Sequence, residues 1–233
     1  MIFSIATPPT QALVNSETDT PVFFCAVSAP TAAGILTDMD KPDKNATGTS
    51  NAIPVSKIID LAQATTPVKK IGLIYSGNED NATNTVKQCE EYLKSINVEY
   101  IEKTAASSND VETATNALIA EGAEAIFVPN DSIIQDGVSK LTEICNEKKI
   151  PTYCSSATTV ASGCFATLAI DDKGIGKKTV DIAMDYVNGK EVADIPAQVV
   201  GIDYCSVSKS AMKTLGISQD NIKTDYKLNV IEN

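Results

Sequence analysis

The sequence predicts an α/β fold built as two doubly wound lobes with parallel sheets, joined by a hinge. Short apolar runs of strand length alternate with segments whose apolar residues recur every three or four positions. Several runs are apolar throughout, as in parallel strands that are buried on both faces. The length of 233 residues suits one or two compact domains.

The elements follow one another as strand, turn and helix along the chain. The expected strands are residues 2–6, 22–27, 70–75, 98–101, 123–128, 150–154, 165–170 and 198–202. Helices are expected after most of them, with apolar stripes such as Val86, Cys89, Leu93 and Ile96. The last expected helix covers residues 206–215. Strands that alternate with helices form parallel sheets with helices on both faces.

Three crossings between the lobes are expected, so each lobe is assembled from separate stretches of chain. Pro67 follows two threonines, Pro196 follows Asp194 and Ile195, and a third crossing is placed near Ala166. The first lobe is therefore expected to comprise residues 1–65 and 167–195. The second lobe is expected to comprise residues 66–166 and 196–233.

The composition argues against several classes of function. The net charge of −11 disfavours binding to nucleic acid or to anionic lipid. The chain has no histidine, which excludes Ser-His-Asp and Cys-His catalysis and removes the most common metal ligand. Its six cysteines form no C-x-x-C pair, and several stand in apolar runs, as expected for buried thiols. We therefore expect neither a metal nor a cofactor.

Polar residues follow the strands where a ligand of an open α/β sheet would bind. These segments are residues 7–10, 28–30, 48–51, 75–78, 130–132 and 155–158. Any one of them can be a helix cap, which is what Ser, Thr, Asn and Asp often provide. Together, helix starts around one cleft would offer N–H groups to a carboxylate. Asp131 could meet an ammonium group, so a small zwitterion such as an amino acid is expected.

Enzyme motifs in the chain are weak, and the sequence predicts no enzyme. Residues 206–209 match S-x-x-K but lack the accompanying S-D-N and K-T-G elements. Residues 174–179 contain G-x-G without the remaining glycine of a nucleotide-binding loop, which indicates an ordinary helix start. Asp171 and Asp172 are interpreted as helix-capping residues rather than as paired catalytic carboxylates.

An ordered series of segments resembles the ABC transporter substrate-binding family of the tryptophan/tyrosine type, which has a type I periplasmic-binding fold. The segments are residues 4–13 (SIATPPTQAL), 21–30 (PVFFCAVSAP), 33–34, 41–42, 45–50 (NATGTS), 70–76 (KIGLIYS), 128–131 (VPND), 150–151, 189–190 and 193–196 (ADIP). They cover nearly the whole chain. Three departures are that Ala29 stands where the family has Asp, that the region around residues 170–172 has fewer tyrosines, and that the family has further strand–helix units ahead of the position of Met1. The resemblance therefore implies that the first lobe is incomplete in this chain.

The resemblance implies the solute-binding component of a bacterial ABC importer, with no catalytic activity. It implies a small amino-acid-like ligand, often aromatic, held between the lobes and delivered to ABC permease subunits in the membrane. The implied location is the periplasm or the extracellular face of the membrane, although no signal segment is expected in this chain. The implied ligand contacts are Thr7, Ser28, Thr49, Ser50, Tyr75, Asn81, Asn130, Asp131 and Ser156. The alternative is a cytoplasmic ligand-sensing regulatory domain of the same fold.

Overall fold

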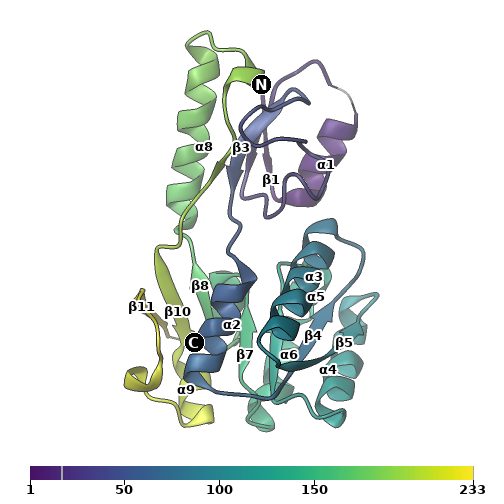
Figure 1. The fold of residues 1–233 in the computed structure, drawn as a ribbon, viewed down its shortest axis with the longest axis vertical. Coiled ribbons are helices and arrows are strands. Elements are labelled where there is room, and N and C mark those ends of the chain that lie inside the picture. Colours follow the sequence, from purple (N-terminus) through teal and green to yellow (C-terminus); the bar gives the residue numbers. More distant parts are fainter. Residues whose placement is uncertain (17, 233) are drawn as a thin grey trace. The chain divides into compact units, whose positions relative to one another are not determined.

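The computed structural model describes residues 1–16 and 18–232, which form two compact units. Unit 1 comprises Met1–Ala52 and Ile170–Ile202, and unit 2 comprises Ile53–Ala169 and the residues from Asp203 onward. The chain therefore passes from one unit to the other three times (Figure 1).

The boundaries differ from those expected from the sequence. The first boundary precedes helix α2 (Val55–Thr65), whereas the sequence analysis placed it after this segment. Helix α2 belongs to unit 2 because it packs against α3 (Asp80–Ser95), β7 (Thr152–Cys154) and β8 (Ala166–Ala169) of that unit. The final boundary falls at residue 203 rather than 196, because β9 (Gln198–Val199) pairs with β3 of unit 1.

Unit 1 is a four-stranded parallel sheet with helices on its two faces. The strand order is β1-β2-β3-β9, and β2 pairs in parallel with both β1 and β3. The elements not yet given are β1 (Ile2–Ile5), α1 (Thr7–Asn15), β2 (Val22–Cys25), β3 (Ala46–Ser50), α8 (Asp172–Val187) and the 3-10 helix Val192–Asp194.

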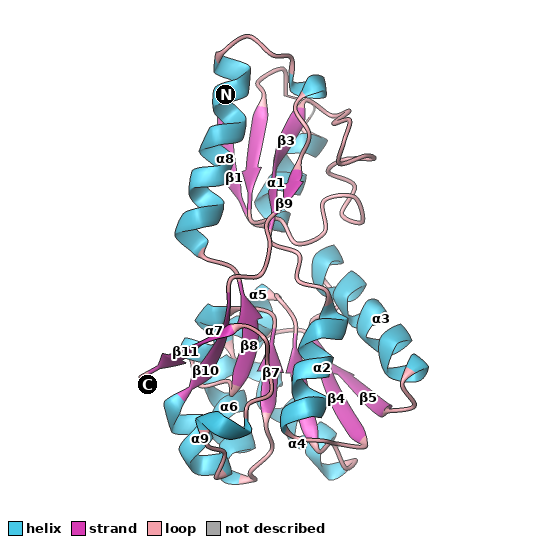
Figure 2. Ribbon diagram, turned by 60° about the vertical axis from the view of Figure 1, so that its left-hand side comes forward, coloured by secondary structure: helices cyan, strands magenta, loops and turns pink. Residues whose placement is uncertain are grey.

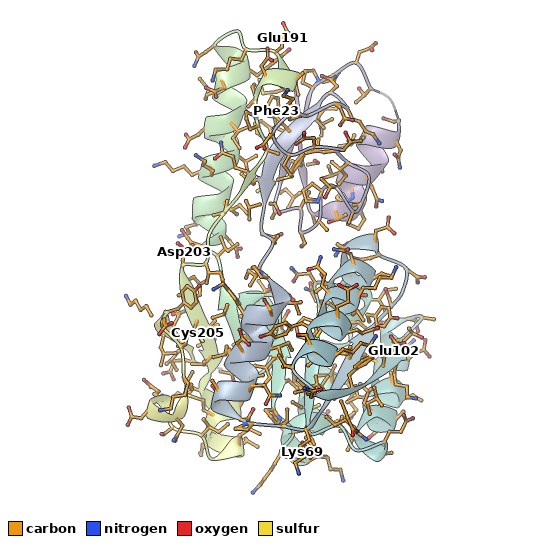
Figure 3. The ribbon with its side chains drawn as sticks, in the orientation of Figure 1. Phe23, Lys69, Glu102, Glu191, Asp203 and Cys205 are labelled. Carbon is orange, nitrogen blue, oxygen red and sulfur yellow. The ribbon has the colours of Figure 1, made fainter. Side chains whose placement is uncertain are left out.

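Alternation along β2 divides the core of unit 1 between the two faces. Phe23 packs with Ile182 and Ala183 of α8 and lies 5.7 Å, centroid to centroid, from the ring of Tyr186 (Figure 3). Phe24 points to the other face and packs with Val14 of α1. Both phenylalanines are fully buried, so β2 is the central hydrophobic strand of this unit.

The β1 edge of the unit 1 sheet carries exposed apolar side chains. Phe3 is 49% and Ile5 is 69% exposed, and both are on an edge strand whose one partner is β2. Helix α8 contacts β2 and β3 and presents Val180, Met184 and Val187 to solvent. Unit 1 thus has a more apolar surface than unit 2, where the structure records no exposed large hydrophobic residue among those described.

Unit 2 is a seven-stranded sheet in the order β11-β10-β8-β7-β6-β4-β5. Its pairs are parallel except β8–β10, which is antiparallel. Its strands are β4 (Lys70–Tyr75), β5 (Glu99–Thr104), β6 (Ala125–Val128), β7 (Thr152–Cys154), β8 (Ala166–Ala169), β10 (Tyr204–Ser208) and β11 (Lys227–Ile231). The predicted α/β fold with parallel sheets is confirmed, and the exceptions are β10 and β11, which both run opposite to the other five strands.

Helices cover both faces of the unit 2 sheet. Helices α2 and α3 (Asp80–Ser95) pack together over one face (Figure 2). The other face is covered by α4 (Val111–Ala120), α6 (Val138–Glu147) and α9 (Lys209–Leu215), with α5 (Ser132–Asp136) and α7 (Ala157–Ala161) as short helices after β6 and β7. The main core of this face joins Ile126 and Val128 to Leu118 and Leu141. Among the described residues, no helix combines the length and the hydropathy that crossing a bilayer requires.

Candidate functional site

The nine predicted site residues all lie at or just after the carboxyl ends of strands, in one group in each unit. In unit 1, Thr7 follows β1, Ser28 follows β2, and Thr49 and Ser50 end β3. Because these three strands are parallel neighbours, the residues share one edge of the sheet. The group in unit 2 is Tyr75 at the end of β4, Asn81 in the first turn of α3, Asn130 and Asp131 after β6, and Ser156 after β7.

In the unit 1 group, Ser28 and Ser50 are joined by hydrogen bonds. The Ser28 hydroxyl donates to Oδ1 of Asn51 at 3.1 Å. The Ser50 hydroxyl donates to the Ser28 carbonyl at 3.5 Å and accepts the Ala52 N–H at 3.2 Å. Asn51, which is in the predicted polar segment 48–51 but not among the nine predicted contacts, therefore belongs to this group. Its signal was its position directly after β3.

Thr49 has a structural role that the sequence did not reveal. Its Oγ1 lies 2.7 Å from Oγ1 of Thr179, which lies within α8, and both side chains are buried. Thr47, two residues earlier on the same face, donates to the Ile195 carbonyl at 2.7 Å. These hydrogen bonds attach the polar strand β3 to α8 and to Ile195. Because the Thr49 hydroxyl is buried and paired, a ligand cannot reach it.

Helix α1 offers few N–H groups to a ligand. Thr7 is its first residue and is followed by Pro8 and Pro9, which have no N–H to donate. The preceding residue, Ala6, makes no capping bond and has a φ of 69°; Ala26, just after β2, has a φ of 56°. Positive φ in alanine is strained, and two such residues at adjacent strand ends mark this edge of the sheet as a conformationally demanding region.

In unit 2, both carboxylate oxygens of Asp131 accept hydrogen bonds from other residues of the protein. Its Oδ2 accepts the N–H of Ser76 at 2.7 Å and the Ser76 hydroxyl at 2.8 Å, and its Oδ1 accepts the Ile134 N–H at 3.1 Å. The side chain is 1% exposed. Asp131 thus caps α5 and attaches the end of β4 to the end of β6. This geometry favours a structural role over the expected contact with a ligand ammonium group.

Asn81, Asn130 and Glu79 surround the same corner. The Asn81 amide Nδ2 donates to the Asn130 carbonyl at 2.7 Å, and Oδ1 of Asn130 accepts from Gln135 at 3.4 Å. Glu79 was not among the predicted site residues. Its carboxylate accepts the Ser132 N–H at 3.0 Å and so occupies the N-terminus of α5. Its only signal was its place immediately before α3.

Tyr75 and Ser156 lie at the ends of β4 and β7. The Tyr75 hydroxyl donates to Glu102 at 3.1 Å, and burial together with this carboxylate raises the Tyr75 pKa (Figure 3). Ser156 accepts the Thr158 N–H at 3.2 Å and caps α7. Beside it is a shallow hollow of about 140 Å³, lined by Gln135, Val138, Thr158, Thr159 and Ser162. This volume is smaller than the roughly 300 Å³ at which ligand pockets usually begin.

The groups that could supply nucleophilic chemistry are mostly buried or paired with another residue. All six cysteines are free thiols, and five are buried. Burial raises the pKa of Cys89 and of Cys205 to about 12 and also raises the pKa values of Cys145 and Cys154. In the S-x-x-K segment, Ser206 is buried in β10, whereas the Lys209 ammonium group binds Glu232 at 2.8 Å. Among the described residues, no group of three His, Cys, Asp or Glu side chains could hold a metal ion.

Comparison with known proteins identifies the family. The model of the family described as ABC transporter substrate binding protein matches residues 1–225. The chain belongs to this family. The predicted resemblance and the predicted type I periplasmic-binding fold are therefore confirmed.

One curated relative supports the assignment. The tyrosine-binding protein of Clostridioides difficile (strain R20291) is 33% identical over 227 residues, which cover 96% of this chain and 66% of that protein. The chain thus spans just under two thirds of the length of that curated relative.

Solved structures agree with the chain over nearly its full length. A structure of an ABC domain from Streptococcus pneumonia in complex with L-Trp has 29% identity and a TM-score of 0.89, over 99% of this chain and 78% of that one. A conserved domain protein from Vibrio cholerae has 30% identity and a TM-score of 0.88, over 97% of this chain and 77% of that one.

Proposed function

We propose that this protein is the substrate-binding component of an ABC importer and that its ligand is an aromatic amino acid. The family match over residues 1–225 is the observation that carries the proposal. The nature of the ligand follows from two relatives, one called a tyrosine-binding protein and one solved in complex with L-Trp. Delivery to membrane permease subunits, and a location in the periplasm or on the extracellular face of the membrane, follow from the importer role.

The polar strand ends of each unit supply the groups that contact the ligand. In unit 1 these are Ser28 and Ser50, and in unit 2 they are Asn81, Asn130 and Ser156. All are hydroxyl or amide groups, which orient a small solute by hydrogen bonds and leave its covalent bonds intact. Raised thiol pKa values keep the buried cysteines protonated at neutral pH, which supports binding without catalysis.

Titration calorimetry of the chain against the common L-amino acids tests the proposal. We expect a Kd near the micromolar range for tyrosine or tryptophan, equivalent to about −8 kcal/mol, and much weaker binding of aspartate and lysine. Ser50→Ala should weaken that binding roughly tenfold, which corresponds to the loss of one hydrogen bond. The control is Ser139→Ala, an exposed serine of α6, which should change nothing. If no amino acid gave binding heat at millimolar concentration, the proposal would be wrong.

A further inference from the structure

One buried polar atom in unit 2 has no hydrogen-bond partner at the proposed site. Asn81 is 4% exposed, and its Oδ1 accepts no hydrogen bond from any described residue. Its Nδ2 donates to the Asn130 carbonyl at 2.7 Å. Reversing the amide would set Oδ1 against that carbonyl oxygen, so the hydrogen bond fixes which end of the amide stays unpaired.

The groups around Asn81 are already paired with one another. Asp131 is occupied by Ser76 and Ile134, and Glu79 is occupied by the Ser132 N–H. The residue before α3 makes no side-chain capping bond to this helix of 16 residues. The unpaired acceptor therefore stands in the first turn of a long helix, and no described residue supplies it with a donor.

The charge around the first turn of α3 determines which kind of ligand donor would be favoured there. Residues 76–85 and 129–136 contain four acidic residues and no lysine or arginine. The carboxylates of Glu79 and Asp80 offset the partial positive charge of the α3 N-terminus. A cationic N–H donor is therefore favoured over a neutral donor or an anion.

We propose that Oδ1 of Asn81 accepts a hydrogen bond from the α-ammonium group of the bound amino acid. This inference rests on the proposed function and deepens it, because it assigns recognition of the amino group to a residue at the start of α3. The ammonium group supplies a donor to Oδ1 of Asn81, which is otherwise buried and unpaired. A carboxylic acid that lacks the amine leaves this oxygen without a hydrogen bond. Asn81 thus separates amino acids from their desamino analogues.

Calorimetry with matched ligands tests this assignment. L-Tyrosine is compared with 3-(4-hydroxyphenyl)propanoate, which lacks the amine, and the analogue is titrated in competition where direct binding is too weak. The wild-type chain should prefer tyrosine by tenfold or more. Asn81→Leu should remove most of that preference, by weakening tyrosine and leaving the analogue within about twofold. Asn84→Leu, on the same helix, is the control and should behave as wild type.

The outcomes separate the two proposals. If the wild-type chain binds tyrosine but Asn81→Leu weakens both ligands equally, Asn81 has only a structural role, and the assignment is wrong while the proposed function stands. Equal wild-type affinity for the two ligands also overturns the assignment. If the chain binds no amino acid, both proposals fail together. Thermal melting of each variant checks that it folds, and Asn81→Ala replaces the leucine variant where it does not.

Discussion

Single polar residues at the strand ends include some whose side chains hold the fold together. Thr49 and Asp131 were predicted as ligand contacts from the family resemblance, and they stand in the polar segments 48–51 and 130–132. In the structure their polar atoms are taken by Thr179 and by Ser76, which are 130 and 55 residues away. A sequence pattern predicts which residues lie at the edge of a sheet. It does not predict the hydrogen-bond partner of each residue, because that partner is distant in the sequence.

Asp131→Ala should destabilise unit 2 because it leaves three donors without an acceptor. The N–H and hydroxyl of Ser76 and the N–H of Ile134 would lose their shared partner in a buried position. The expected loss is about 3 kcal/mol or more in the free energy of unfolding, measured by urea denaturation. Asp136→Ala, at the exposed end of the same helix, is the control and should stay within about 0.5 kcal/mol. Equal stability of the two variants would mean that Asp131 has no structural role and is again a candidate ligand contact.

At the scale of elements, the sequence predicts best those strands whose apolar character is continuous. Residues 70–75 and 123–128 were predicted as strands, and β4 and β6 lie within them. Strand β3, with the sequence ATGTS, was not predicted because its buried side chains are small or polar. Its burial depends on the pairing of its threonine hydroxyls with the Ile195 carbonyl and with the Thr179 hydroxyl of α8.

Long-range pairing also explains the errors near the end of the chain. Residues 206–215 were predicted as one helix, whereas the structure has β10 up to Ser208 and α9 from Lys209. Strand β10 forms because it pairs with β8 on one side and with β11 on the other. Ser208 then caps α9 by accepting the Ala211 N–H at 3.1 Å. The prediction of a helix was correct for residues 209–215, whereas strand pairing with β8 and β11 places residues 206–208 in β10.

Two glycines of unit 1 should respond in opposite directions to alanine. A Cβ at Gly48 in β3 would lie 1.9 Å from the carbonyl oxygen of Phe24, so Gly48→Ala must separate β3 from β2. We expect a loss of about 3 kcal/mol or more in the free energy of unfolding. A Cβ at Gly176 in α8 meets nothing within 4 Å, so Gly176→Ala should gain about 0.5–1 kcal/mol from helix propensity. Urea denaturation measures both, and a stable Gly48→Ala variant would contradict the register of β2 and β3.

At the scale of the whole molecule, unit 2 contains everything that an independent domain needs. It has a seven-stranded sheet with helices on both faces and a continuous apolar core. The chain leaves it after β8 and returns at β10, and these two strands pair in antiparallel fashion, with Ala169 opposite Tyr204. The point of exit and the point of return are therefore neighbours, and the Asp203 N–H donates to the Ala169 carbonyl at 2.9 Å.

This adjacency predicts that unit 2 folds alone when unit 1 is excised. In a chain that starts at residue 53, residues 171–202 are replaced by Asn-Gly, so that Ile170 and Asp203, next in register, flank a two-residue hairpin turn. The excised chain should give a dispersed amide NMR spectrum and a cooperative urea transition, because its core residues are all retained. The matched control joins the same residues and carries Asp131→Ala, which should lower its unfolding midpoint. A collapsed, undispersed spectrum for the excised chain would mean that unit 2 depends on unit 1 for its stability, contrary to the self-contained core seen here.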